Sequence, residues 1–370
     1  MNGVESATRA RPTELRELTT LRLGGPCGDV VVAESEDDLI AAVAGADADG
    51  TQVLLLSGGS NVVVADAGFG GRVVLVRTCG VSTAGAGDRD GDGDGDRRWA
   101  GAGDGDVIVE AAAGESWSQF VAQMVAHGRS GVEALAGIPG CVGSTPIQNV
   151  GAYGQEVADT IVGVRVWDRA AGAVVELDPA ACQFSYRSST FKANPDRYVV
   201  LSVKFRLPGT GASAPIRYPE LATRLGVEVG QRADLADVSG TVVELRRGKG
   251  MVLDAADHDT WSAGSFFTNP ILSPDEAAAL DPAAPRFTAG DGRVKTSAAW
   301  LIDHAGFDRG YRLRPDAKVS ISTKHTLALT NRGGATTEEL LELARAVRAR
   351  VRSKFGITLV PEPVLVGCQL

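Results

Sequence analysis

Several features that mark common protein classes are missing from this 370-residue sequence. Its five cysteines are widely spaced and form no CxxC pair, and its four histidines form no HExxH pattern, so no metal-binding motif is present. The first residues lack the apolar core of a signal peptide, and no apolar run is long enough to cross a bilayer. These absences predict a cytoplasmic protein with reduced thiols, no membrane insertion and no metal site.

Positive charge is also scarce, with 37 basic against 46 acidic residues and a net charge of −9. This balance argues against a general nucleic-acid binder, which is usually basic. An anionic ligand would need a locally basic site or clustered backbone N–H groups. The length suits two or three domains, and the 44% hydrophobic and 22% charged content is typical of a globular protein.

The common nucleotide-binding motifs are absent, because no GxxxxGK[ST] occurs and no GxGxxG follows the first strand. The chain has instead two glycine-rich, uncharged loops, SGGSNVVV (57–64) and IPGCVGSTPIQNVGAYG (138–154). Each is either a set of tight turns or a nest of backbone N–H groups that holds phosphate. Two such loops would suit a dinucleotide, but the residues alone leave both readings open.

Hydrophobic patterning predicts a mixed α/β N-terminal segment followed by antiparallel strands. Ser35 and Asp38 form a capping-box pattern at the start of a helix, and Thr336 and Glu339 do the same for the clearest helix, 336–355. Further strands are expected at 29–33, 52–64, 72–78, 106–114, 160–168, 172–178 and 197–207. The Gly/Asp-rich stretch 84–106 is predicted to be disordered. A calcium loop there would need glutamate where Trp99 or Gly101 stands.

Three short motifs contain candidate functional residues. GSFFTNP holds Ser265 and Asn269, FSYRSSTFK holds Arg187, and LVPEPVLVG places Glu362 between prolines in an apolar run. Alone, the serine reads as a turn residue and the arginine as a surface or salt-bridge residue. The glutamate is the least ordinary, because an unpaired carboxylate in apolar surroundings is costly.

Taken together, seven motifs in fixed order resemble the UDP-N-acetylenolpyruvoylglucosamine reductases, the MurB family. They extend from about Thr19 to Gly367 and read TTLRLGGP, LSGGSNVVV, ALAGIPGCVGSTPIQNVGAYGQEV, FSYRSSTFK, GSFFTNP, AAWLID and LVPEPVLVG. The resemblance implies an α+β fold of three domains, two of which bind FAD in the manner of the vanillyl-alcohol-oxidase type while the third covers the substrate. The predicted boundaries are 1–78 with 355–370, then 79–249, and 250–354.

The resemblance also assigns residues. The implied catalytic residues are Arg187, Ser265 and Glu362. Tyr218, which marks the longer-looped type with a substrate-closing tyrosine, would bind substrate together with Lys249 and Asn269. His304 stands where some members have a glutamine that contacts the diphosphate, and it is not assigned. The implied FAD contacts are Arg22, Gly58, Gly59, Ser60, Asn61, Ile138, Pro139, Gly140, Gly143, Ser144, Thr145, Gln148, Asn149, Gly151, Ala152 and Tyr153.

The function implied is NADPH-dependent, FAD-mediated reduction of UDP-N-acetylglucosamine enolpyruvate to UDP-N-acetylmuramate in peptidoglycan synthesis, by a monomer. One alternative is an FAD-dependent sugar or alcohol oxidase or dehydrogenase of the same cofactor fold, which would not require GSFFTNP or Tyr218. Another is an inactive UDP-sugar or nucleotide sensor, which the presence of all three matched catalytic residues opposes.

Overall fold

The N-terminal part of the chain forms a small parallel sheet beside one helix. The computed structural model describes residues 12–84, 105–289 and 292–370. The sheet has the order β1-β4-β2, with both pairs parallel, and its strands are β1 (Cys27–Ala33), β4 (Phe69–Val76) and β2 (Val53–Leu56). The helix α1 (Glu36–Ala48) begins after Ser35, whose side chain completes the predicted capping box with Asp38.

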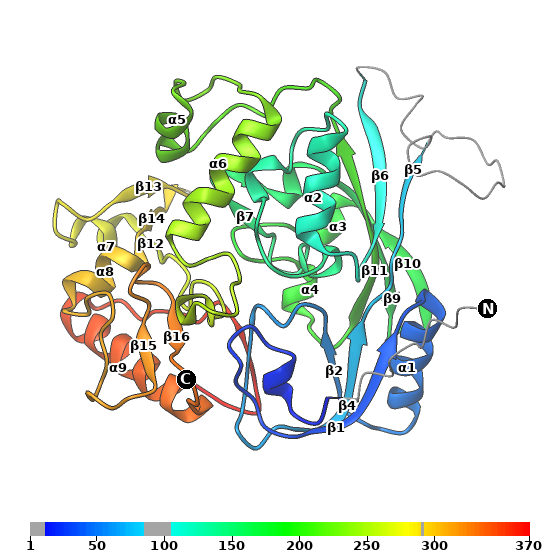
Figure 1. The fold of residues 1–370 in the computed structure, drawn as a ribbon, viewed down its shortest axis with the longest axis horizontal. Helices are drawn as coiled ribbons and strands as arrows, with labels where there is room; N and C mark the ends of the chain where they lie inside the picture. The colour runs from blue at the N-terminus through cyan, green and yellow to red at the C-terminus, as the bar shows by residue number, and fades with distance from the viewer. Residues whose placement is uncertain (1–11, 85–104, 290–291) are drawn as a thin grey trace.

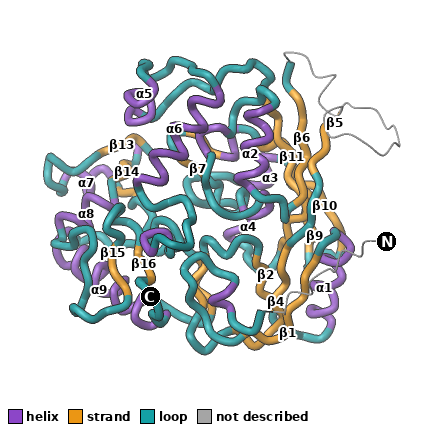
Figure 2. Tube along the Cα trace, in the orientation of Figure 1, coloured by secondary structure: helices purple, strands orange, loops and turns teal. Residues whose placement is uncertain are grey.

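A five-stranded antiparallel sheet forms the largest layer, along one side of the molecule (Figures 1 and 2). In the order β10-β9-β11-β6-β5, its strands are Ala173–Leu177, Ile161–Asp168, Tyr198–Leu207, Val107–Ala112 and Val81–Ala84. The predicted antiparallel strands are confirmed. Most of the stretch predicted to be disordered, residues 85–104, lies outside the described residues.

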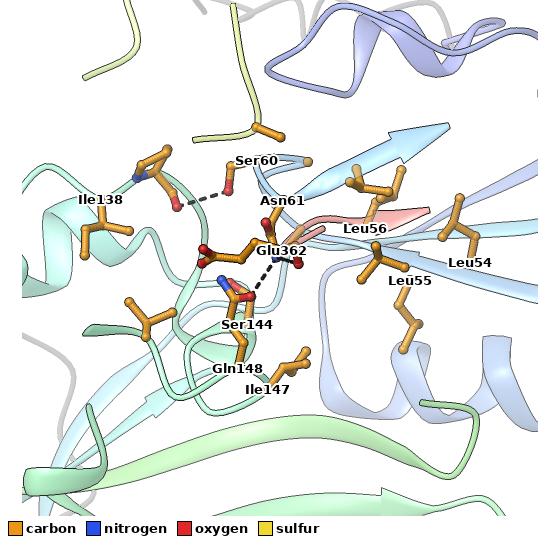
Figure 3. A pocket seen from close by; sticks show the side chains of 17 residues that line it. Leu54, Leu55, Leu56, Ser60, Asn61, Ile138, Ser144, Ile147, Gln148 and Glu362 are labelled. Atoms are coloured by element: carbon orange, nitrogen blue, oxygen red, sulfur yellow. Dashed lines mark hydrogen bonds between the residues drawn. The ribbon is translucent and has the colours of Figure 1, made fainter. Parts of the chain in front are cut away.

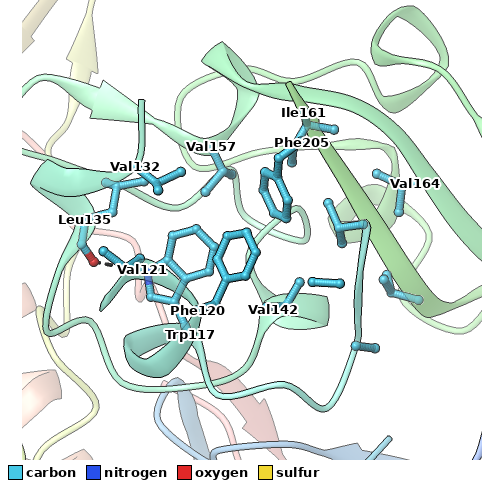
Figure 4. Close-up of a cluster of buried hydrophobic side chains, with 14 of the residues drawn as sticks. Trp117, Phe120, Val121, Val132, Leu135, Val142, Val157, Ile161, Val164 and Phe205 are labelled. Atoms are coloured by element: carbon cyan, nitrogen blue, oxygen red, sulfur yellow. Dashed lines mark hydrogen bonds between the residues drawn. The ribbon is translucent and has the colours of Figure 1, made fainter. Parts of the chain in front are cut away.

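The core beneath this sheet supports the second glycine-rich loop. The rings of Trp117 and Phe120, on α2 (Trp117–Ala126), lie against Phe205 of β11, with centroids 5.0 Å apart for the two phenylalanines (Figure 4). The indole N–H of Trp117 donates to the Leu135 carbonyl at 3.0 Å. Leu135 and Val142 are both fully buried in this cluster. The core therefore anchors the chain just before the second glycine-rich loop and again within it.

Shorter elements surround that core. They are β7 (Gly151–Ala152), β8 (Gln155–Glu156), α3 (Pro179–Cys182), α4 (Thr190–Ala193), α5 (Pro219–Leu225) and α6 (Leu235–Gly248). α6 packs against α2 and ends just before Lys249, so it places that lysine at the boundary with the C-terminal region.

The C-terminal region lies on the side of the molecule opposite the five-stranded sheet (Figure 2), and it has its own core. Its strands are β12 (Ile271–Leu272), β13 (Arg286–Thr288), β14 (Val294–Thr296), β15 (Val319–Ile321) and β16 (Leu329–Asn331). Its helices are α7 (Pro274–Ala278), α8 (Ala298–His304) and α9 (Thr337–Phe355). The predicted capping box of Thr336 and Glu339 is present in α9.

The end of the chain returns to the N-terminal part. β17 (Val364–Val366) pairs in parallel with β3 (Val62–Val64), which forms the end of the first glycine-rich segment. This pairing places Glu362 beside residues that precede it by about three hundred positions. Within the described residues, no helix has the length and apolar character needed to cross a membrane.

Candidate active site

The two glycine-rich loops face each other across a cavity of about 250 Å³ (Figure 3). Leucines of β2, the start of β3, the 138–150 loop, Ala263 and Glu362 complete its walls. Seven of the predicted FAD residues line it, namely Gly59, Ser60, Asn61, Ile138, Pro139, Ser144 and Gln148. Among the described residues that line it, Glu362 is the one that is charged, so these walls are apolar or neutral except at that point.

Direct contacts hold the two loops together. The Ser60 hydroxyl donates to the Pro139 carbonyl at 3.1 Å, and the Asn61 amide donates to the Gln148 side-chain oxygen at 2.9 Å. A Cβ added to Gly58 would lie 2.6 Å from the Cα of Gly140, so the backbones approach more closely than any side chain allows. The glycines therefore permit the close approach of the two loops.

Other predicted FAD residues support the loop rather than line this cavity. Thr145 is buried and its hydroxyl donates to the Val142 carbonyl, and Asn149 donates its amide N–H to Glu156. Gly143 packs against Ala113 and Gly151 against Glu156, each too closely for a Cβ. Ala152 lies in β7, where it packs against the core beneath the five-stranded sheet.

Arg22 and Gly58 border a second cavity of about 470 Å³, which Arg16 and Arg77 also line. The Arg22 guanidinium lies 4.0 Å from the centroid of the Trp261 ring, a cation–π contact. Neither Arg22 nor Gly58 is among the residues that line the first cavity. Ser57 and Gly59, the neighbours of Gly58 in sequence, do line the first cavity.

Arg187 pairs with Glu362, the charged residue that lines the first cavity. Arg187 Nε lies 3.2 Å from Glu362 Oε1, and the side chains are only 19% and 14% exposed. The guanidinium also donates to the carbonyls of Asn149 and Gly151, at 3.2 and 2.6 Å. The contact with Glu362 is an ion pair without hydrogen-bond geometry, and the buried Nε has no hydrogen-bond partner among the described residues. Burial raises the pKa of Glu362, although Arg187 and Lys192 act in the opposite direction.

Ser265 is held next to this pair by the backbone. The carbonyl of the following residue, Phe266, accepts a hydrogen bond from the Glu362 N–H at 2.9 Å. Phe266 and Phe267 are both 1% exposed, so they anchor the segment in the C-terminal core. The Ser265 side chain is half-buried, and its hydroxyl has no partner among the residues that the structure describes. It remains available to a ligand.

The predicted substrate residues fall into two groups. Tyr218 and Tyr153 form an edge-to-face pair with centroids 5.3 Å apart, and Lys249 Nζ lies 5.5 Å from the Tyr153 ring centroid. Tyr153, predicted as an FAD contact, lies beside two of the predicted substrate residues. Lys249 pairs with Glu220 at 2.7 Å; burial opposes its charge, but this hydrogen bond leaves the lysine pKa raised.

Asn269 lies apart from that cluster, where its side-chain oxygen accepts from Ala298 N at 2.9 Å. It also hydrogen-bonds Tyr186, the neighbour of Arg187 in sequence. The asparagine therefore connects the first turn of α8 with the segment that carries Arg187.

Comparisons with known proteins agree with this geometry. A profile described as the UDP-N-acetylenolpyruvoylglucosamine reductase C-terminal domain matches residues 255–366, and an FAD binding domain profile matches residues 29–178. The reductase of this name from Streptomyces avermitilis is 53% identical, covering 96% of this chain and 94% of its own length. That from Thermobifida fusca is 53% identical, covering 98% and 99%.

The chain belongs to the UDP-N-acetylenolpyruvoylglucosamine reductase family. A crystal structure of such a reductase from Thermus caldophilus covers 95% of this chain and 97% of its own, with a TM-score of 0.61 and 23% identity, so it has the same fold. The predicted fold class, an α+β FAD-binding fold with a C-terminal α+β domain, is confirmed. The domain boundaries stay predictions.

As a member of this reductase family, the protein is an oxidoreductase with FAD as cofactor. The described residues fit that group: the loops leave no room for Cβ atoms at their contact, and the cavity walls between them are apolar or neutral except at Glu362. No cluster of three or more His, Cys, Asp or Glu suited to a metal occurs in the described parts of the chain.

The sequence patterns did not point to two polar residues near the site, His325 and Lys192. His325 is close enough to Lys249, Arg309 and Arg246 for their charges, together with burial, to lower its pKa to about 4. His304, by contrast, is exposed at the end of α8, where its ring stacks on that of Trp300 with centroids 3.8 Å apart. Lys192 Nζ donates to the Arg187 carbonyl at 3.0 Å. Its place at the end of the motif FSYRSSTFK was the only feature of the sequence that pointed to it.

Proposed function

We propose that this reductase converts UDP-N-acetylglucosamine enolpyruvate to UDP-N-acetylmuramate in cytoplasmic peptidoglycan synthesis, with NADPH as hydride donor. The supporting observation is that Glu362, which lines the cavity between the glycine-rich loops, pairs with Arg187 and hydrogen-bonds the residue that follows Ser265. The ion pair of Arg187 with Glu362, and the Glu362 hydrogen bond to Phe266, bring three distant segments to one place.

Bound FAD supplies a carrier that accepts hydride from NADPH and delivers it to the methylene carbon of the enolpyruvyl group. Negative charge then develops on the adjacent carbon and spreads into the substrate carboxylate. The Arg187 guanidinium is fixed by two backbone carbonyls and keeps one buried N–H without a hydrogen-bond partner among the described residues. Such a preorganised cation stabilises charge as it forms.

Glu362 and Ser265 would complete the reaction. The raised pKa of Glu362 favours its neutral form, which donates a hydrogen bond to the same carboxylate. Ser265 would give its hydroxyl proton to the carbanion-like carbon, which is basic enough to take it, and would recover a proton from solvent. Hydride at one carbon and a proton at its neighbour convert the enol ether to a lactyl ether.

Lys249 and Tyr218 would hold the UDP group, and Asn269 would order the segment beside it. The pair of Lys249 with Glu220 is partly exposed, with side chains 32% and 43% accessible. Exposed ion pairs contribute little stability. A diphosphate would therefore replace the glutamate at small cost, and Lys249 gives this acidic protein positive charge at that point.

The test uses the two half-reactions of the purified holoenzyme under anaerobic conditions. NADPH is expected to bleach the flavin absorbance, and UDP-N-acetylglucosamine enolpyruvate is expected to restore it. A flavin that stays reduced with this substrate but is reoxidised rapidly by oxygen, and is reduced by a sugar donor, would instead support an oxidase of the same fold. A protein that takes up no FAD would contradict the proposal.

Ser265→Ala is the first variant to measure. Loss of the proton donor is expected to slow reoxidation by substrate about 100-fold or more, while NADPH still reduces the flavin within about twofold of the wild-type rate. Ser82→Ala, an exposed serine on β5, is the matched control. Reoxidation of the Ser265→Ala flavin at the wild-type rate would remove Ser265 from the mechanism.

A further inference from the structure

The turn that carries Arg187 is unusually constrained. Arg187 has a φ of +52°, in the left-handed region, and Ser185 and Ser188 exchange backbone hydrogen bonds of 3.0 and 3.1 Å around it. A non-glycine residue is held in that region only when its surroundings enforce it. The conformation aims the guanidinium at the carbonyls of Asn149 and Gly151 and at Glu362.

The same turn is fastened to the second glycine-rich loop. The Ser189 hydroxyl donates to the Ile147 carbonyl at 2.6 Å and accepts from the N–H groups of Phe191 and Lys192, which caps α4. Phe191 is 4% exposed and fixes the helix in the core. These contacts hold α4, and with it Lys192, in a fixed position relative to the Arg187 turn.

Lys192 reaches back to the carbonyl of Arg187 itself, with Nζ donating at 3.0 Å. This lysine is half-buried, and it forms no ion pair with a carboxylate among the described residues. Burying an ammonium group against a neutral carbonyl is unfavourable compared with leaving it in water. The lysine nevertheless remains here, which calls for a role beyond the stability of the turn.

The charges around the site indicate that role. Arg187 and Lys192 both act to lower the pKa of Glu362. Lys295 Nζ lies 4.7 Å from the ring centroid of the neighbouring Tyr186, whose phenol has a pKa raised by burial. Two cations therefore face one carboxyl group. The excess positive charge matches a ligand carboxylate and the negative charge that would develop during its reduction.

We propose that Lys192 is a positioning residue for the reductive half of the reaction: it holds the Arg187 turn in its left-handed conformation and supplies a second positive charge beside Glu362. This inference rests on the proposed function. Lys192 acts through Arg187 and Glu362, and no contact with substrate is assigned to it.

Lys192→Met removes the charge and the hydrogen bond while keeping most of the side-chain volume. Reoxidation of reduced flavin by substrate is expected to slow about 10- to 100-fold, because the positive charge of Lys192 is lost and the Arg187 guanidinium is displaced. Flavin content and reduction by NADPH are expected to stay within twofold. Lys192→Arg should recover much of the rate. Lys204→Met, which breaks an exposed pair with Glu176 on β11, is the matched control.

The pH dependence separates this role from a merely structural one. Removing a positive charge beside Glu362 makes its carboxylate less favourable, so its titration must move to higher pH. The descending limb of the reoxidation rate is therefore expected to move upward by about half a pH unit or more in Lys192→Met. A lower rate with an unmoved limb would overturn the electrostatic part of the proposal, and an unchanged rate would overturn all of it.

A measurement without substrate keeps this test independent of the proposed function. The infrared band of the Glu362 carboxyl, identified as the band missing in Glu362→Gln, is titrated in the oxidised holoenzyme. We expect a higher midpoint in Lys192→Met than in the wild type or Lys204→Met. If wild-type flavin is not reoxidised by substrate, the proposed function fails. An unmoved infrared midpoint instead contradicts the role of Lys192.

Discussion

Glu362 combines structural and chemical contacts in one residue. Its N–H bonds the Phe266 carbonyl, its carbonyl is 3.5 Å from the Asn61 amide, and its carboxyl pairs with Arg187. The backbone bonds fix where the carboxyl points, and the surrounding burial raises its pKa. In the sequence, the two prolines around an acid indicated an unusual carboxylate, but none of its three partners is predictable from a local pattern.

His325 allows a prediction about stability in acid. Its folded pKa is about 4, below the usual 6.5, so the unfolded chain binds more protons between these values. The stability from neutral His325 is complete above pH 6.5 and is lost as the pH falls toward 4. We expect His325→Gln to lose less thermal stability than the wild type between pH 7.5 and 5, measured by melting temperature.

The exposed His304 provides the control for that measurement. His304→Gln is expected to follow the wild-type curve, because its ring stacks on Trp300 at the surface of α8. If His325→Gln loses as much stability in acid as the wild type, burial of neutral His325 does not contribute to acid sensitivity.

At the scale of elements, local patterns were predictable and long-range contacts were not. The capping boxes of α1 and α9 lie within four consecutive residues, so the sequence contains the whole interaction. The bond between Asn61 and Gln148 joins positions 87 apart, and no periodicity encodes it. Assigning these residues to one site depended on family resemblance, which left His304 unassigned, and no local pattern marked His325.

The contact of the two glycine-rich loops gives a prediction at this scale. Gly58→Ala places a Cβ 2.6 Å from the Gly140 backbone, which must move. Overpacking of this kind costs about 1–3 kcal/mol, so we expect FAD affinity to fall about tenfold or more. Fluorescence titration of the apoprotein with FAD measures the change.

Gly70→Ala is the matched control, because a Cβ there meets nothing within 4 Å and Gly70 has no positive φ. It should bind FAD as the wild type does. Equal affinities for the Gly58→Ala and Gly70→Ala proteins would show that the close approach of the loops is not needed to hold the cofactor.

At the scale of the molecule, the site lies where separately packed regions meet. The core under the five-stranded sheet and the core around α9 contain different residues, and the cavity draws its walls from both halves of the chain. A ligand at such a junction stabilises the arrangement of the parts as well as each part. The FAD-bound and FAD-free proteins should therefore differ in global stability.

Mass action sets the size of that difference. At a free FAD concentration 100 times its Kd, the folded protein gains about 2.7 kcal/mol, which corresponds to a rise of roughly 4 °C or more in melting temperature. Calorimetry over a range of FAD concentrations should give a melting temperature that rises with the logarithm of concentration. FMN, which lacks the adenylate half, should raise it less; an equal rise would mean that the two-loop cradle does not hold the dinucleotide.

The pairing of β3 with β17 has a consequence for synthesis of the chain on the ribosome. β3 is fully apolar and buried, and its strand partner is encoded 302 residues later, since Val62 pairs with Val364. At 5–20 residues per second, roughly 15–60 s separate the two strands during translation. During that time Val62–Val64 present an unpaired apolar edge, the kind of surface that chaperones shield in nascent proteins. Glu362 arrives with the strand that covers the edge, so the site gains its carboxylate only when the nascent chain closes.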